Sequence, residues 1–99
     1  MIYFVSRHQG AVEWVQHQTE WKVDCFLPHL DTAKVEAGDV VLGTLPLHLA
    51  AEVCVISAAV AFYFLQLPQK LQLRGSEYSA DEMNRMGACL RRFDVRAWD

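Results

Sequence analysis

Cysteine is scarce in this sequence. Its 99 residues contain three, Cys25, Cys54 and Cys89, which lie far apart and form no C-x-x-C pair. Small secreted domains are held together by an even set of paired cysteines, and zinc ribbons use closely spaced ones. The count and the spacing therefore argue against both classes, and we expect a protein of the reducing cytoplasm.

Positive charge is also scarce. The chain has 9 Lys and Arg residues against 12 Asp and Glu residues, which gives a formal net charge of −3 at pH 7. A protein that coats nucleic acid gains its affinity by neutralising phosphates over a basic face. We therefore expect no duplex nucleic acid among the partners, whereas one small anionic ligand in a local pocket is compatible with this charge.

No apolar run is long enough to cross a membrane. The most apolar stretch, 53–65, is shorter than the roughly 20 residues of a spanning helix, and Glu52 and Gln66 bracket it. The apolar start of the chain, residues 1–5, lacks the basic region of a signal peptide. With 53% hydrophobic residues, the chain has enough apolar material for one packed core. We expect a single domain over residues 1–99 and no membrane partner.

Short β-favouring apolar runs alternate with helical segments along the chain. The predicted strands are residues 2–5, 23–27, 39–42 and 61–67, the predicted helices are residues 11–18, 44–54 and 80–93, and a loop is predicted at 68–78. Between the second and third strands, residues 31–38 are polar and predict at most one turn of helix. This alternation indicates βαβ units with right-handed crossovers. The predicted fold class is therefore α/β: a small Rossmann-like parallel sheet of order 2-1-3-4, flanked by helices.

Capping residues predict where two of the helices begin. Thr44 is the expected cap of the second helix, with Pro46 in its first turn, where proline loses no hydrogen bond. Residues 79–82 match a capping box, and apolar residues with 3-4-3 spacing follow it over 83–93. The last segment, 93–98, is compatible with a terminal edge strand or with a partner-binding tail.

Ligands bind open parallel sheets beyond the carboxyl ends of the strands. The residues after the four predicted strands fall in the segments 6–10, 28–31, 43–46 and 66–68. In the predicted fold these segments meet at one edge, which then carries an arginine, two histidines, two hydroxyls and the amino ends of two helices. The candidate site residues are Ser6, Arg7, His8, Gly10, His29, Gly43, Thr44, Leu45 and Pro46.

These residue types suit a phosphate. Helix amino ends present free N–H groups and partial positive charge. Arg7 can donate two parallel hydrogen bonds to phosphate oxygens, and the hydroxyls of Ser6 and Thr44 can add donors. Gly10 and Gly43 permit close approach of the backbone. The glycine-rich fingerprints of dinucleotide and P-loop sites are absent, as are the spacings of a metal site, so we expect neither a cofactor nor a metal.

Each segment also has a purely structural interpretation. Residues 6–8 are compatible with a solvated loop, residues 43–46 with an ordinary helix start, and His29 with a surface histidine. One segment alone is therefore weak support for a site. Their concurrence at the strand ends favours a ligand site.

Several segments resemble a family of small CRISPR-associated proteins encoded beside type III systems. They are residues 6–14, 29–31, 38–46, 49–53 and 79–83, and the resemblance extends over nearly the whole chain. The segment after the third strand also resembles the ligand loop of CARF domains, which are Rossmann-like sensors of cyclic oligoadenylates. The resemblance implies a ring nuclease that binds cyclic tetra-adenylate and linearises it, which switches off type III antiviral signalling.

The chemistry that this resemblance implies needs no metal. A ribose 2′-hydroxyl attacks the adjacent phosphorus, and the product carries a 2′,3′-cyclic phosphate. Arg7 is then the expected stabiliser of transition-state charge, and His8 the expected acid or base. A symmetric ring that is wide for so short a chain also implies a homodimer. The remaining ligand contacts would be made by Ser6, His29, Gly43 and Thr44.

Two other functions remain open from the sequence. A sponge or sensor would hold the cyclic oligoadenylate without cleaving it, and it would need the same residues. A structural interaction subunit would use the strand-end residues only to cap helices, and it would not bind the ring. Substitution of Arg7 or His8 separates an enzyme from a sponge, because only an enzyme loses turnover while it retains binding.

Overall fold

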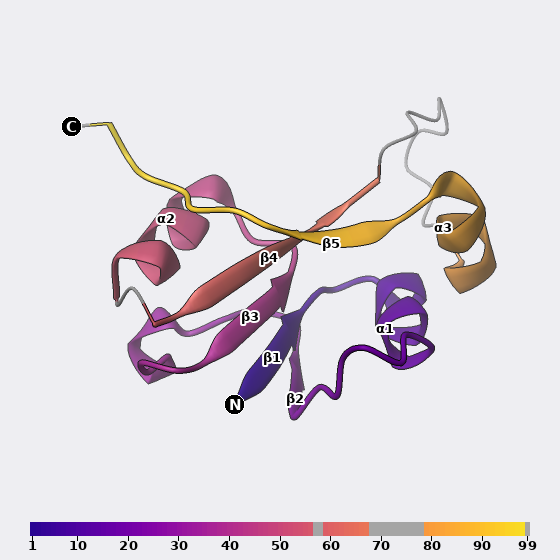
Figure 1. The fold of residues 1–99 in the computed structure, drawn as a ribbon, viewed down its shortest axis with the longest axis horizontal. Coiled ribbons are helices and arrows are strands. Elements are labelled where there is room, and N and C mark those ends of the chain that lie inside the picture. Colours follow the sequence, from indigo (N-terminus) through magenta and orange to yellow (C-terminus); the bar gives the residue numbers. More distant parts are fainter. Residues whose placement is uncertain (57–58, 68–78, 99) are drawn as a thin grey trace.

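The computed structural model describes residues 1–56, 59–67 and 79–98. These residues form an α/β fold in which a five-stranded sheet lies between helices (Figure 1). Within this part of the chain, no helix reaches the length and hydropathy of a membrane span. The loop predicted at 68–78 lies outside the described residues. In chain order the elements are β1 (Ile2–Val5), α1 (Gln9–Gln16), β2 (Cys25–Leu27), the 3-10 turn η1 (Thr32–Lys34), β3 (Val40–Gly43), α2 (Leu47–Ile56), β4 (Ala61–Gln66), α3 (Ala80–Met86) and β5 (Cys89–Arg92).

The strand order in the sheet is β2-β1-β3-β4-β5. β1 pairs in parallel with β2 and with β3, and β3 pairs in parallel with β4, so the first four strands keep one direction. β5 pairs antiparallel with β4 and adds an edge strand to the predicted order 2-1-3-4. The sheet is therefore mostly parallel rather than wholly parallel.

Both faces of the sheet are buried, each under its own helices. α2 covers one face, where Val5 and Val41 belong to the core. α1 and α3 cover the other face, where Phe4 and Leu42 pack with Trp14 of α1. Successive residues of a strand point to opposite faces, so both neighbours in β1 are buried, Phe4 at 0% and Val5 at 3% exposure. Burial on both faces explains why β1 is an uninterrupted apolar run.

The predicted strands are confirmed with shifted ends. β1 has the predicted bounds, whereas β2 begins at Cys25, two residues later than predicted. β3 is shifted by one residue and includes Gly43, and β4 ends at Gln66, one residue earlier than predicted. The ends differ because pairing with a neighbouring strand decides them, and β2 pairs with β1 over three residues only. The single turn predicted within 31–38 is η1.

The third predicted helix is wrong in its second half. α3 ends at Met86, where Gly87 adopts a φ of +81° and ends the helix in the left-handed conformation. The following residues, which the 3-4-3 spacing assigned to the helix, instead form β5, with Leu90 paired to β4. The edge strand therefore lies at 89–92 and not at 93–98.

Two of the three helices begin elsewhere than predicted. Thr44 does not cap α2, because the helix begins three residues later, and the Thr44 N–H donates to the Val5 carbonyl at 3.0 Å and so extends the ladder between β1 and β3. α2 begins at Leu47, and the Pro46 carbonyl accepts the N–H groups that close its first turn. α1 begins at Gln9, two residues earlier than predicted. In α3, by contrast, both hydrogen bonds of the predicted capping box are present.

Candidate functional site

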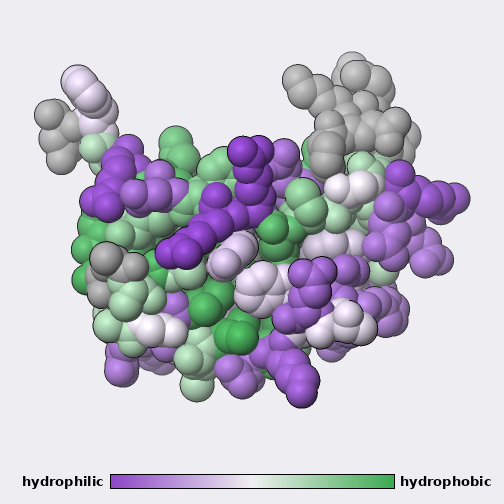
Figure 2. Space-filling view, viewed as in Figure 1, coloured by the Kyte–Doolittle hydropathy of each residue, from purple (hydrophilic) through white to green (hydrophobic). Residues whose placement is uncertain are grey.

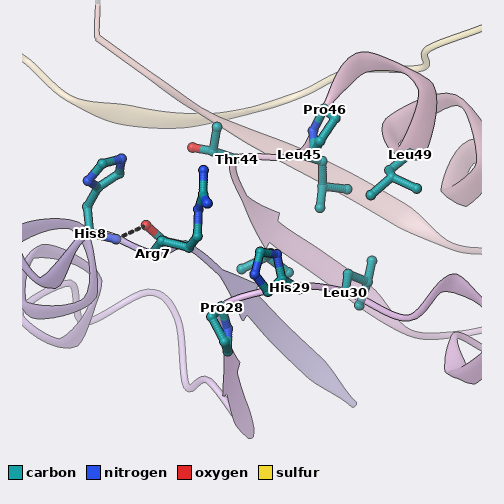
Figure 3. Close-up of a pocket in the computed structure, with 11 residues that line it drawn as sticks. Arg7, His8, Pro28, His29, Leu30, Thr44, Leu45, Pro46 and Leu49 are labelled. Atoms are coloured by element: carbon teal, nitrogen blue, oxygen red, sulfur yellow. Dashed lines mark hydrogen bonds between the residues drawn. The ribbon is translucent and has the colours of Figure 1, made fainter.

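The segments that follow β1, β2 and β3 line one cavity of about 370 Å³ (Figure 3). The three strands are parallel and in register, with Val5 of β1 opposite both Leu27 of β2 and Gly43 of β3. Their carboxyl ends therefore stop at one level, and the segments that leave them meet there. The lining residues are Val5, Ser6, Arg7, His8, Pro28, His29, Leu30, Thr44, Leu45, Pro46 and Leu49.

The cavity has an apolar floor and a polar rim. The floor is formed by Val5, Leu30 and Leu45, which are at most 8% exposed and belong to the core under α2. A ligand with an apolar part and an anionic part would match both surfaces. The rim groups, by contrast, are exposed to solvent: Arg7, His8, His29 and Thr44.

Ser6 forms the turn between β1 and α1. Its N–H donates to the Leu27 carbonyl at 3.0 Å, where the ladder with β2 ends. Its Oγ accepts the N–H of His8 at 3.1 Å (Figure 3). The His8 carbonyl in turn accepts the N–H of Val12 as the first turn of α1 closes. This turn holds Arg7 and His8 at the cavity, and the Ser6 hydroxyl can still donate its proton to a ligand.

Two helix amino ends adjoin the cavity. His8 is the N-cap of α1, Pro46 directly precedes α2, and both residues line the cavity. The first N–H groups of a helix have no acceptor within the helix and carry partial positive charge. An anion in the cavity would therefore lie close to two helix amino ends.

Arg7 is the cation of the rim. Its side chain extends from the end of β1 toward Thr44 (Figure 3). Within residues 1–56, 59–67 and 79–98, no carboxylate pairs with its guanidinium. Its five N–H donors are thus available to an anion, although the chain as a whole is acidic. The same described residues contain no group of three His, Cys, Asp or Glu side chains that could hold a metal ion.

The cavity lies inside a stretch of sequence that matches a known protein family. Residues 3–96 match the family described as "Putative CRISPR-associated protein (Cas_VVA1548)". The chain belongs to this family. No curated protein and no solved structure significantly matches this CRISPR-associated protein.

Two of the predicted site residues of the CRISPR-associated protein, Gly10 and Gly43, do not line the cavity. Gly10 is buried in the first turn of α1. Gly43 has a φ of +116°, and a Cβ at this position would overlap with the Val5 carbonyl oxygen of β1. The close approach of β3 to β1 therefore explains this glycine without a ligand, and contact of either glycine with a ligand stays a prediction. The predicted residues that do line the cavity are Ser6, Arg7, His8, His29, Thr44, Leu45 and Pro46.

Sequence reasoning missed most of the apolar part of the site, although it included Leu45. Val5, Leu30 and Leu49 line the cavity, and none of them was among the candidates. Val5 is the last residue of a buried strand, and Leu49 stands three residues after Pro46, which is close to one helical turn. A helix start placed at residue 47 would have turned Leu49 back toward the same edge. The segment after β4, which was also expected at this edge, contributes no described lining residue.

Proposed function

We propose that this CRISPR-associated protein binds cyclic tetra-adenylate in the cavity and acts as a ring nuclease that ends type III antiviral signalling. One observation carries this proposal: a single cavity joins Arg7, His8 and His29 to the starts of α1 and α2. Membership of the CRISPR-associated family supports it. So does the resemblance of the segment after β3 to the ligand loop of Rossmann-like CARF domains.

The two surfaces of the cavity suit the two parts of a nucleotide. A phosphate at the rim would meet Arg7, Thr44 and the partial positive charge of two helix starts. A base in the cavity would pack against Leu45 of the floor and against Leu49, which also lines the cavity. The cavity, at about 370 Å³, is near the lower end of the range for ligand pockets, about 300–1,000 Å³. One nucleotide unit therefore fits it better than a ring of four, and the rest of the ring would extend beyond the cavity.

The proposed reaction is a transesterification within the ring. The ribose 2′-oxygen bonds to the adjacent phosphorus while the bond from phosphorus to the 5′-oxygen breaks. The 2′-hydroxyl gives up one proton and the 5′-oxygen gains one, so no water is consumed. His8 carries a proton at one of these oxygens, with His29 as the second candidate. Arg7 stabilises the charge that grows on the phosphoryl oxygens.

Incubation of the purified protein with cyclic tetra-adenylate in excess EDTA tests this function. We expect linear di- or tetra-adenylate that ends in a cyclic phosphate, identified by chromatography and mass. A ring that stays intact but bound identifies a sponge or sensor. A ring that is neither bound nor cleaved overturns the proposal.

A matched pair of histidine variants tests the proton transfer. His17 is exposed at the opposite end of α1 from His8 and does not line the cavity. We expect His8→Ala to lose cleavage while it retains binding, and His17→Ala to behave like the parent. Equal cleavage by the two variants would refute the role of His8, and His29→Ala would then be compared with the same control.

A further inference from the structure

β5 and the segment that follows it, residues 93–98, form one edge of the sheet, which we name the β5 edge. β5 stands last in the strand order, and no strand within the described residues pairs with its outer side. The chain continues from β5 past α2 and then leaves the body of the molecule (Figure 1). Near its end, Trp98 is 100% exposed. An open strand edge of this kind is a template for pairing with another chain.

Backbone contacts decide which groups of the β5 edge face outward. The Phe93 N–H donates to the Phe62 carbonyl of β4 at 3.0 Å. The Phe93 carbonyl accepts from Cys54 Sγ of α2 at 3.8 Å, and the Val95 N–H donates to the same sulfur at 3.3 Å. The odd-numbered residues therefore turn their backbone groups toward β4 and α2. Since these groups alternate along an extended chain, Arg92 and Asp94 turn theirs to the open side, and the proposal below extends this alternation to Arg96 and Trp98.

The side chains of this segment divide in a similar way. Asp94 and Arg96 are exposed, and the Arg96 Nε and Nη2 donate to the two carboxylate oxygens of Asp94 at 3.1 and 3.4 Å. Figure 2 shows hydrophilic atoms along the path of β5 with apolar surface beside them. Residues 93–98 thus carry one charge of each sign, two residues apart, and β5 adds the exposed Arg91 and Arg92. Phe93 and Val95, in contrast, line an apolar groove of about 370 Å³ together with Leu45, Leu47, Ala50, Phe62 and Phe64.

We propose that the β5 edge binds the β5 edge of a second copy of this chain, antiparallel about a two-fold axis at Val95. In this register Asp94 lies opposite Arg96 of the second copy, and the symmetric pair forms on the other side of the axis. Each pair would exchange two backbone hydrogen bonds, because both residues turn their N–H and carbonyl groups outward. Arg92 lies opposite Trp98 of the second copy, which gives the exposed indole a cation–π partner.

Charge and burial select this register over its neighbours. An axis at Asp94 would place the two copies of Asp94 opposite each other, and an axis at Arg96 would do the same with the two copies of Arg96. With the axis at Phe93, Arg92 would lie opposite Asp94 of the second copy. In that register, however, Arg96 would lie opposite an apolar residue and Trp98 would gain no cation. The proposed register gives a complementary partner to each of the four even-numbered residues from 92 to 98.

The apolar groove adds area to the same seam. Leu47 is 76% exposed and Phe93 is 38% exposed. A two-fold axis perpendicular to the sheet places the two grooves on the same side of the joined sheet, next to each other. A strand pair alone buries less than the roughly 1,200–2,000 Å² of a stable interface. We therefore expect the interface to include the exposed groove residues Leu47 and Phe93 of both copies in addition to the paired strands.

Sedimentation velocity of the full chain over a range of concentrations tests this interface. We expect a monomer–dimer equilibrium in the parent. Arg96→Glu places acidic residues opposite each other twice, and it should weaken the dimer by about tenfold or more. The double variant Asp94→Arg/Arg96→Glu reverses both charges, and it should return the dissociation constant to within about threefold of the parent. Recovery in the double variant would also show that Arg96→Glu had not simply failed to fold.

Lys22→Glu is the matched control, because Lys22 is exposed, lies outside the β5 edge, and undergoes the same change of charge. We expect it to dimerise like the parent. A parent that is monomeric at all concentrations, or a dimer that Arg96→Glu leaves unchanged, overturns the proposal. An axis at Phe93 would instead pair Arg92 with Asp94 of the second copy. In that case Arg92→Glu would abolish the dimer, the added change Asp94→Arg would restore it, and Arg96→Glu would have no effect. This outcome would overturn the proposed axis at Val95. No nucleotide is present in these measurements, so their outcome is independent of the proposed ring cleavage.

Discussion

At the scale of single residues, Gly43 has little freedom to change. Its φ is +116°, and a Cβ there would overlap with the Val5 carbonyl oxygen. Gly38 offers a matched control, because its φ is +93° but a Cβ would meet nothing within 4 Å. We expect Gly43→Ala to lower the free energy of unfolding by about 3 kcal/mol or more, and Gly38→Ala by about 1–2 kcal/mol, as measured by urea unfolding. Equal losses in the two variants would contradict the close approach of β3 to β1.

Arg7 supplies positive charge at the rim. In the proposed reaction this charge is needed most in the transition state, when negative charge grows on the phosphoryl oxygens. We expect Arg7→Ala to lower the rate of ring cleavage by about 100-fold or more, as is usual when a donor to a developing charge is removed. Arg7→Lys keeps the charge without the planar pair of donors, so it should recover only part of the rate. Single-turnover cleavage measures both variants. Arg85→Ala, an exposed arginine of α3, is the control, and a parent-like rate in Arg7→Ala would refute the role.

The contacts of Asp39 predict how the free energy of unfolding depends on pH. Its carboxylate accepts the N–H of Glu36 at 2.9 Å and pairs with the Met1 ammonium at 3.0 Å, and these contacts lower its pKa below the usual 3.8. Because the folded pKa is the lower one, this stabilisation is present above the unfolded pKa and is lost as the pH falls through the folded value. We expect Asp39→Asn to be less stable than the parent at neutral pH and to lose less stability on acidification. Urea midpoints measured from neutral pH to below the usual pKa check this, and an unchanged acid profile would contradict it.

At the scale of elements, apolar runs predicted the strands but misjudged one helix. The buried runs identify β1, β3 and β4, because each pairs on both sides inside a sheet that is covered on both faces, whereas β2 is an edge strand without a buried residue. After Met86, however, Leu90 continues the helical spacing of α3 although the helix has already ended at Gly87. A glycine directly after a helical run is the sequence cue for such an end. The pairing of β5 with β4 joins segments far apart in the chain, and periodicity carries no information on that pairing.

The capping box of α3 gives a prediction at this scale. Ser79 Oγ accepts the Glu82 N–H at 3.2 Å, and Glu82 Oε1 accepts the Ser79 N–H at 2.9 Å, a hydrogen bond that also lowers the pKa of Glu82. We expect Ser79→Ala to lower the free energy of unfolding by about 1 kcal/mol, measured with urea. Ser79→Thr keeps the accepting oxygen and should lose less. If both variants match the parent, packing of Met83 and its neighbours holds α3 without the cap.

At the scale of the whole molecule, the candidate site follows from strand direction more than from any motif. β1, β2 and β3 run parallel and end at one level, which is why segments far apart in the chain line one cavity. This much could be predicted, since the alternation of strands and helices implies a parallel sheet. The place of Leu49 in the cavity could not, because it depends on the position of α2, which begins at Leu47 and not directly after the predicted cap, Thr44.

Ligand binding should stabilise the whole chain, and a ring that cannot react allows this to be measured. Cyclic tetra-deoxyadenylate lacks the 2′-hydroxyl nucleophile, so the proposed reaction cannot cleave it. At about 100 times its Kd, a bound ligand adds about 2.7 kcal/mol to the free energy of unfolding. For a chain of 99 residues this raises Tm by about 10 °C or more.

Salt then separates phosphate binding from apolar binding. Phosphates held at an exposed rim by Arg7 and two helix starts are screened by added ions, so the rise in Tm should shrink as NaCl is increased. Differential scanning calorimetry at several salt concentrations measures both effects, and His8→Ala should keep the full rise because its proposed role is proton transfer. The absence of any rise in the parent would exclude the ring as a ligand, and with it both the ring nuclease and the sponge. A rise that is insensitive to salt would instead locate the ligand on the apolar floor and remove the phosphate contacts on which the proposed cleavage depends.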